Sequence, residues 1–131
     1  MVRSVWDSIG VSTDRGIDAV KRGLSIQCLK DFLHETQLPR ASVLHVLKVT
    51  VREVESKHRL TREESERLWR LASIYQKSLA LFEGDAERTV RWLTAPQKAL
   101  GDVSPLKHIV TEPGAAQVQE LIGRIEYGVL S

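Results

Sequence analysis

The sequence has a single cysteine, no long apolar run and no recognisable catalytic motif, and each absence excludes a class of protein. With only Cys28, a disulfide framework within the chain and a thiolate metal site are both excluded. The lone thiol fits a reducing compartment, so we expect a cytoplasmic protein. No segment approaches the roughly 18 apolar residues needed to span a bilayer, and the first residues lack the apolar core of a signal peptide.

Catalytic patterns are missing throughout the chain. The four histidines form neither a His-x-Glu nor a His-Glu-x-x-His pattern; they are His34, His45, His58 and His108. There is no Gly-x-Ser-x-Gly elbow, no glycine loop that binds phosphate and no pair of carboxylates in a turn. Cys28 lies in an apolar helical pattern, where a cysteine is more often a core residue than a nucleophile. We therefore expect no enzyme, no metal site and no cofactor.

The composition that remains is that of an ordinary globular protein. The chain has 131 residues, of which 42% are hydrophobic and 27% charged. This length fits one domain, or two small helical units that share a core. The chain shows no apolar–polar alternation and no Asn-Gly hairpin signal, and nearly every segment has helical spacing. We therefore predict an all-α fold.

Capping residues divide the chain into short helices and one long helix. Ser25 precedes an apolar pattern that breaks near Gln37, and Thr50-x-x-Glu53 is a capping box before a short helix. A second box, Thr61-x-x-Glu64, opens the longest predicted helix, which ends at Gly84. Its apolar face is either internal core or the seam of a homodimer; the residues are Leu68, Leu71, Ala72, Tyr75, Leu79 and Phe82.

Three regions follow from this division. We predict a flexible arm over residues 1–16, a cluster of short helices over 17–60, and the long helix with a compact C-terminal set over 61–131. No Gly/Ser-rich linker separates the last two regions, so we expect them to pack together. The final helix is predicted from Ala115 to Tyr127, after a turn at Pro113-Gly114.

Positive charge is concentrated in the middle of the chain. Between Arg40 and Arg62, six basic residues minus two acidic ones leave a local charge of +4, in a chain whose total is +2. The rest of the chain is therefore at −2. The basic segment indicates either a surface that faces a polyanion or a solvated helix face.

The same segment has the layout of a helix-turn-helix, in which the second helix enters the major groove of DNA. That helix begins at Thr50, and Val51 and Val54 are expected to face inward. The candidate DNA-binding residues, for bases or phosphates, are Thr50, Arg52, Ser56, Lys57 and Arg59. Two short amphipathic helices are also common in any helical bundle, and Glu53 and Glu55 repel phosphates if they face the DNA backbone.

The C-terminal stretch has two features that need separate explanations. Prolines and glycines between Pro96 and Gly114 are typical of helix boundaries, with Trp92 as a core anchor. They do not explain the ending, where Tyr127 and an apolar pair follow the last helical stripe. An exposed aromatic residue and two aliphatic residues near a terminus indicate a surface for a partner protein.

Residues 92–129 also carry a specific pattern: Trp92-Leu93, Pro96, Ala99-Leu100-Gly101, Pro105-Leu106, Gly114, Val118, Leu121 and Arg124-Ile125-Glu126-Tyr127-Gly128-Val129. This pattern resembles the C-terminal toxin-binding domain of the Xre/MbcA/ParS antitoxins, the partners of RES-domain toxins. The resemblance extends over residues 17–131, since residues 61–72 are similar to that family's central helix. Gln97 and Asp102 depart from the family, which commonly has Asn and Gly there. The recognition-helix pattern is only loosely matched.

The resemblance implies a fold in which an Xre-like helix-turn-helix cluster packs on a C-terminal helical toxin-binding domain. RES-domain toxins are similar in fold to ADP-ribosyltransferases and consume NAD, and the antitoxin is expected to cover the toxin's active site. The implied toxin-binding residues are Arg124, Glu126, Tyr127, Gly128, Val129, Leu130 and Ser131. The implied partners are the toxin, operator DNA for autoregulation and a second copy of this chain within a hetero-oligomeric complex. The alternative is a stand-alone helix-turn-helix regulator that dimerises through its C-terminal half.

Overall fold

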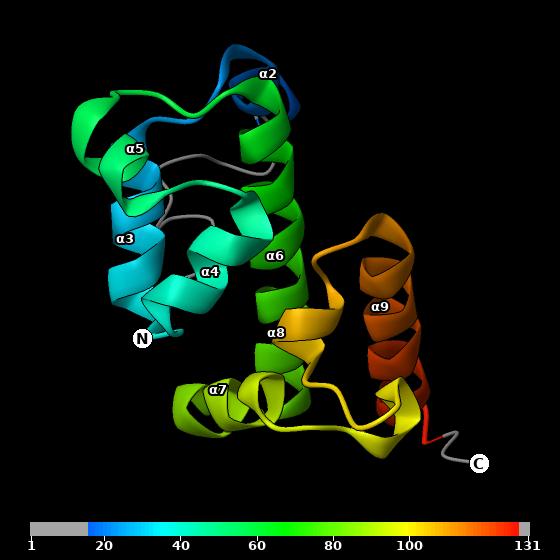
Figure 1. Ribbon diagram of the computed structural model, residues 1–131. Helices are drawn as coiled ribbons and strands as arrows, with labels where there is room; N and C mark the ends of the chain where they lie inside the picture. Colours follow the sequence, from blue (N-terminus) through cyan, green and yellow to red (C-terminus); the bar gives the residue numbers. More distant parts are fainter. Residues whose placement is uncertain (1–15, 129–131) are drawn as a thin grey trace. The chain divides into compact units, whose positions relative to one another are not determined.

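The computed structural model describes residues 16–128, and the regular structure within them is helical (Figure 1). The elements are α2 (Gly16–Arg22), α3 (Ile26–Thr36), α4 (Arg40–Leu47), α5 (Val51–Ser56), α6 (Arg62–Leu81), α7 (Ala86–Thr94), the 3-10 helix η2 (Lys98–Leu100), α8 (Pro105–His108) and α9 (Glu112–Glu126). Extended pairing in this range is limited to two isolated bridges, Ser25 with Arg59 and Gln97 with Val103. The predicted all-α fold is confirmed.

Part of the sequence-based description lies outside the described residues. This applies to residues 1–15 of the predicted arm and to Val129, Leu130 and Ser131. Gly16, the last residue assigned to that arm, begins α2. The chain divides into two compact units, residues 1–72 and 73–131, with the boundary inside α6. The functional domains over 17–60 and 61–131 stay a prediction.

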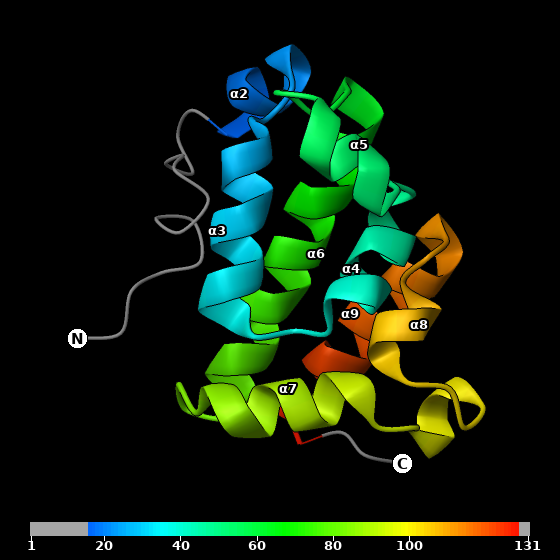
Figure 2. The same cartoon turned by 60° about the vertical axis from the view of Figure 1, so that its left-hand side comes forward.

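In the first unit, α2 to α5 gather around residues 62–72 of α6 (Figures 1 and 2). The side chains that fill the space between these helices are those that the helical spacing selects. Fully buried residues of this unit include Leu29 and Phe32 of α3, Val43 and Leu47 of α4, and Leu68 and Leu71 of α6. Their burial is the main favourable contribution to the stability of this unit.

Both predicted capping boxes are formed. Thr50 Oγ1 accepts a hydrogen bond from Glu53 N at 3.1 Å, and Glu53 Oε1 accepts one from Thr50 N at 3.2 Å. At α6, Glu64 N donates to Thr61 Oγ1 at 3.1 Å and Thr61 N donates to Glu64 Oε1 at 2.9 Å. Each box satisfies two backbone N–H groups that the helix leaves unpaired, and this fixes where α5 and α6 begin.

The prediction that both valines of α5 face the core is wrong for one of them. Val54 is buried with 2% exposure, but Val51 is 52% exposed. α5 has only six residues, and Val51 is the first of them. The first residue of so short a helix has no preceding helical turn to hold it against the core. Helical spacing alone therefore does not bury it.

The second unit contains the end of α6 and the helices that follow. α8 contacts both α7 and α9, and η2 contacts α9. The turn after η2 passes through two left-handed residues, Gly101 with φ +70° and Asp102 with φ +64°. Aspartate tolerates this conformation better than most residues, because its short polar side chain can bond locally. The position therefore accepts Asp102 where the family commonly has glycine.

The start of α9 differs from the prediction. α9 begins at Glu112, so Pro113 and Gly114 lie in its first turn rather than in a preceding turn. Thr111 is the N-cap, and its side chain accepts a hydrogen bond from Gly114 N at 3.1 Å. Proline is well suited to the first helical turn because its missing N–H has no partner there. The Pro-Gly pair was misleading because it is more often found in turns.

Gly114 is required where it stands. A Cβ at this position would collide with the backbone carbonyl of His108, whereas a Cβ at Gly123 in the same helix would meet nothing within 4 Å. We predict that Gly114→Ala lowers the free energy of unfolding by about 2 kcal/mol. Gly123→Ala, the matched control, should raise it by about 0.5–1 kcal/mol because alanine is the better helix former. Urea unfolding followed by circular dichroism measures both; equal effects would contradict the close approach at Gly114.

Candidate functional site

α9 ends in a way that redirects the chain. Tyr127 N donates to the Gly123 carbonyl at 3.0 Å, and Gly128 N donates to the Ile125 carbonyl at 3.1 Å. Gly128 has φ +70°, a left-handed conformation that glycine adopts without strain. Gly128 therefore lies just beyond the end of α9, two residues after Glu126.

The predicted toxin-binding residues that the structure describes lie together at this end of α9. Tyr127 is 80% exposed, and Arg124, Glu126 and Gly128 are exposed as well. Arg124 Nη2 donates to Glu120 Oε1 at 2.6 Å, one turn earlier on the same helix. Both partners face solvent, so this ion pair contributes little and can be exchanged for another partner. The last three residues of the predicted set, Val129 to Ser131, lie outside the described range.

A hollow of about 260 Å³ lies beside the end of α9. Its lining combines aliphatic groups with charges of both signs: Lys77, Ala80, Leu81, Glu83, Ile125 and Glu126. Lys77 Nζ donates to Gln119 Oε1 at 3.1 Å, a bond that links α6 to α9. Ile125, expected in the core stripe, is only half-buried and faces this hollow. We call this the tail hollow.

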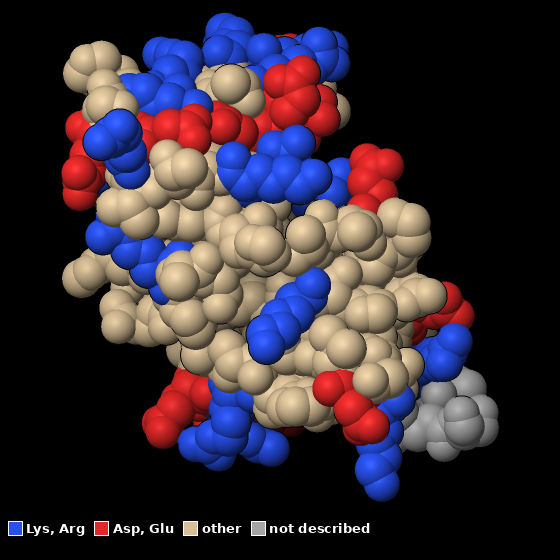
Figure 3. Space-filling model, in the orientation of Figure 1, with Lys and Arg blue, Asp and Glu red and all other residues tan. Residues whose placement is uncertain are grey.

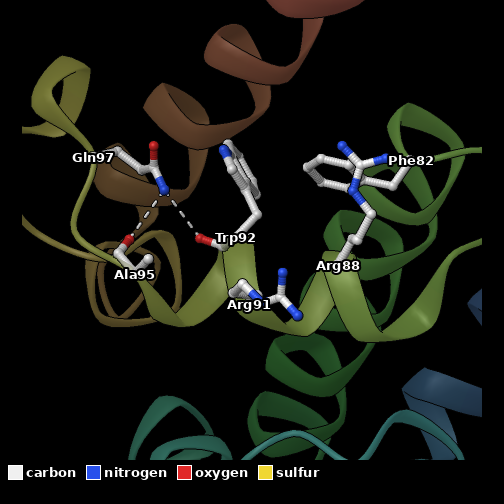
Figure 4. A pocket seen from close by; sticks show the side chains of 6 residues that line it. All are labelled: Phe82, Arg88, Arg91, Trp92, Ala95 and Gln97. Carbon is white, nitrogen blue, oxygen red and sulfur yellow. Dashed lines mark hydrogen bonds between the residues drawn. The ribbon is translucent and has the colours of Figure 1, made fainter.

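A second hollow of about 290 Å³ is lined by Phe82, Arg88, Arg91, Trp92, Ala95 and Gln97 (Figure 4). The rings of Phe82 and Trp92 have centroids 6.3 Å apart and are tilted by 55°. The guanidinium carbon of Arg88 lies 5.3 Å from the centroid of the Phe82 ring, within cation–π range. Gln97 Nε2 donates to the carbonyls of Trp92 and Ala95 at 3.2 and 3.1 Å. We call this the aromatic hollow.

Sequence reasoning missed the aromatic hollow because Trp92 was interpreted as a core anchor. The indole is in fact half-buried and forms a wall of the hollow. A signal was available in the sequence. Arg91 and Trp92 follow Arg88 by three and four residues, so both lie next to Arg88 on the surface of α7. An arginine-rich helix face that also carries a tryptophan is typical of a binding surface.

The candidate DNA-binding residues divide into two groups. Lys57 Nζ lies 2.6 Å from Glu64 Oε1 and 3.5 Å from Glu53 Oε2, and Arg59 Nη1 donates to the Gly23 carbonyl at 2.7 Å. Together with Thr50 in its capping box, these side chains hold α5 and the segment after it in place. Thr50 and Arg59 are exposed despite these bonds, and Arg52 and Ser56 are exposed on α5.

Charges of both signs lie on this part of the molecule. Figure 3 shows lysines and arginines at its upper end, over α2, α5 and the start of α6, with carboxylates among them. The surface is therefore not a uniformly basic face. A DNA contact here depends on the few exposed bases, and the long-range attraction of a polyanion is reduced by the acidic neighbours.

Hydrogen bonds and ion pairs around α5 shift the pKa values of Lys57 and Glu53. The hydrogen bond to Glu64 is the largest cause that raises the pKa of Lys57 above its ordinary 10.5, with the attraction of both carboxylates adding to it. The backbone N–H of Thr50 is the largest cause that lowers the pKa of the Glu53 carboxyl below 4.5. Both shifts favour the charged forms in the folded protein.

Neither a metal site nor a membrane-spanning helix is found among the described residues. Between residues 16 and 128 no three histidine, cysteine, aspartate or glutamate side chains are grouped to hold a metal ion. In the same range no helix combines the length and the apolar character needed to cross a membrane.

Comparison with known proteins assigns most of the second unit to a known domain. Residues 78–128 match the antitoxin Xre/MbcA/ParS C-terminal toxin-binding domain. A protein named Antitoxin Xre from Yersinia enterocolitica is 34% identical, over 98% of this chain and 92% of its own length. The chain belongs to the Xre antitoxin family. The end of α9 and the whole aromatic hollow therefore lie within the toxin-binding domain of an antitoxin, whose partner is a toxin protein.

Two more Xre antitoxins are similar. The one from Photorhabdus laumondii is 28% identical over 97% of this chain and 90% of its own length. The one from Pseudomonas putida is 35% identical over 57% of this chain and 46% of its own length. The resemblance to this family that the sequence pattern indicated is confirmed.

The ion pairs of Lys57 give the antitoxin a testable dependence on pH. Because the pKa of Lys57 is raised on folding, its contribution to stability is fully present below its unfolded pKa and is lost as pH rises through the folded pKa. We predict that Lys57→Gln lowers the free energy of unfolding at neutral pH, and that its difference from the unsubstituted protein shrinks at strongly alkaline pH. Lys21→Gln, an exposed control on α2, should show no such convergence in denaturant titrations. A difference independent of pH would refute this role of the Lys57 charge.

Proposed function

We propose that this antitoxin neutralises an NAD-degrading RES-domain toxin by covering the toxin's active site with the end of α9 and the residues after it. The observation that carries the proposal is the exposure of Tyr127, 80%, at the end of a helix that belongs to a matched toxin-binding domain. The proposed contact residues are Arg124, Glu126, Tyr127, Gly128, Val129, Leu130 and Ser131. The protein acts by binding, without catalysis of its own.

The geometry supports this role in three ways. Tyrosine supplies a large rigid contact area, and it is enriched at the centre of protein interfaces. Gly128 adopts a left-handed conformation, which ends the helical path just beyond α9. The Arg124 guanidinium and the Glu126 carboxylate are exposed and available for charged groups at a nucleotide-binding cleft.

Removal of the last five residues tests the proposal. We predict that deletion of Tyr127 to Ser131 abolishes neutralisation, measured as NAD consumption by the toxin with the antitoxin in excess. The fold should be retained, with a change in unfolding free energy within about 0.5 kcal/mol, because loss of surface groups costs little. Val51→Ala, which removes an exposed apolar side chain of the first unit, is the control and should neutralise fully. Full neutralisation by the truncated protein would show that the tail is not the inhibitory element.

We also propose that the antitoxin binds its own operator through α4 and α5, and so represses its own synthesis. A homodimer within the toxin complex would present two such helix pairs to two half-sites. The observation that favours this is the short turn of residues 48–50 between the two helices, with Arg52 and Ser56 exposed on α5. Thr50, Lys57 and Arg59 position the helix, and Arg59 is also exposed.

Arg52 is the cleanest probe of DNA binding, since it is exposed and its loss does not remove an ion pair of the Lys57 type. We predict that Arg52→Ala weakens binding to the operator and reduces the slope of log K against log salt by about one, the value for a single phosphate contact. Lys107→Ala, an exposed charge in the second unit, should leave the slope unchanged. An operator affinity unaffected by Arg52→Ala would remove α5 as the recognition helix. DNA binding without any toxin binding would favour the stand-alone regulator.

A further inference from the structure

The arginines that line the aromatic hollow are available to pair with an acidic group of a ligand. Its lining includes two arginines and no carboxylate. The acidic partner in contact is Glu87, whose Oε1 lies 3.4 Å from Arg91 Nη2, with the two side chains 86% and 70% exposed. A pair this exposed contributes little and gives way readily to a better partner. The hollow is therefore built to receive negative charge.

The arginine on the other side is held in an orientation suited to a carboxylate. Arg88 is exposed, yet its guanidinium rests on the Phe82 ring at 5.3 Å from the centroid (Figure 4). Stacking on an aromatic ring leaves the planar edge of the guanidinium free for two parallel hydrogen bonds to one carboxylate. Because the ring limits the side chain's freedom in advance, less entropy is lost when a ligand binds.

The floor of the hollow is rigid and partly apolar. The Phe82 and Trp92 rings contact each other at a tilt, which is a favourable arrangement for aromatic pairs. Gln97 uses its amide hydrogens on the carbonyls of Trp92 and Ala95, which fixes the wall opposite the phenyl ring. Such a floor accepts an aliphatic or aromatic side chain beside the carboxylate.

The aromatic hollow and the tail hollow are lined by neighbouring residues of the chain. Phe82 lies between Leu81 and Glu83 in the chain, and those two residues line the tail hollow at the end of α9. The end of α6 and the turn after it therefore contribute to both hollows. A toxin that contacts the tail hollow meets a segment in which the neighbouring side chain, Phe82, lines the aromatic hollow.

We propose that the aromatic hollow is a second docking point for the toxin, and that it receives an acidic side chain with an apolar neighbour from the toxin surface. This inference rests on the proposed function and assigns a separate task to each site. The tail blocks the active site, whereas Arg88 and Arg91 provide affinity and fix the register of the complex. Charged groups in such positions act mainly on partner choice and on the rate of association.

The test uses the double variant Arg88→Ala/Arg91→Ala and the RES-domain toxin that the proposed function names as partner. We expect Kd, measured by titration calorimetry, to rise roughly 10- to 100-fold, since interface arginines are often worth a factor of ten or more each. Neutralisation at saturating antitoxin should stay complete because the tail is intact. The matched control is Lys21→Ala/Lys30→Ala, which removes two exposed charges of the first unit, more than 50 residues before the hollow in sequence, and should bind normally.

These measurements test the second docking point separately from the proposed function. A double variant that binds as tightly as the unsubstituted antitoxin overturns the second docking point and leaves the tail role standing. An equal loss in the control variant also overturns it, because net charge alone would then explain the effect. If the unsubstituted antitoxin does not bind the RES-domain protein at all, the proposed function fails and the inference fails with it.

Discussion

The absence of a side chain at Gly114 allows the first turn of α9 to rest against the backbone carbonyl of His108, and the proposed site depends on this contact. Thr111 caps the helix at the same point, so its start is fixed by a hydrogen bond and by close packing. Burial of Val118, Leu121 and Ile122 then holds the helix along its length. A helix fixed at its start places its last residues in a defined position, and Gly128 sets the direction in which the chain leaves it.

Side-chain bonds also fix α5 and the segment after it. Here, however, they involve basic residues that the sequence suggested for DNA binding. Lys57 joins α5 to the start of α6 through Glu64, and Arg59 is bound to the Gly23 carbonyl. These basic residues therefore serve first as parts of the fold. The residues that remain exposed on α5 include Val51, Arg52 and Ser56.

Features that depend on neighbouring residues could be predicted from the sequence. Both capping boxes require only residues within one helical turn, and both are found. The helical stripe of α9 is buried at Val118, Leu121 and Ile122, but Ile125 at its end is half-buried. The start of α9 was misplaced because Pro113 and Gly114 have two common uses, and only the contact with His108 decides between them. The exposure of Val51 likewise depends on how a very short helix is seated.

The candidate site was predictable only in part, for the same reason. The family pattern pointed to the end of α9, since the residues there are consecutive. The aromatic hollow combines Phe82 with side chains from α7 and with Gln97, so it exists only once the chain has folded. The internal partners of Lys57 and Arg59 are also separated from them in sequence. Charge counting along the chain cannot distinguish a base that binds DNA from one that binds a carbonyl of its own protein.

The most direct test is a crystal structure of this antitoxin in complex with the proposed RES-domain toxin. We expect Tyr127 and the residues after Gly128 to lie inside the toxin's nucleotide-binding cleft, with α9 leading to the entrance. A complex in which those side chains remain in solvent, away from the cleft, would contradict this expectation.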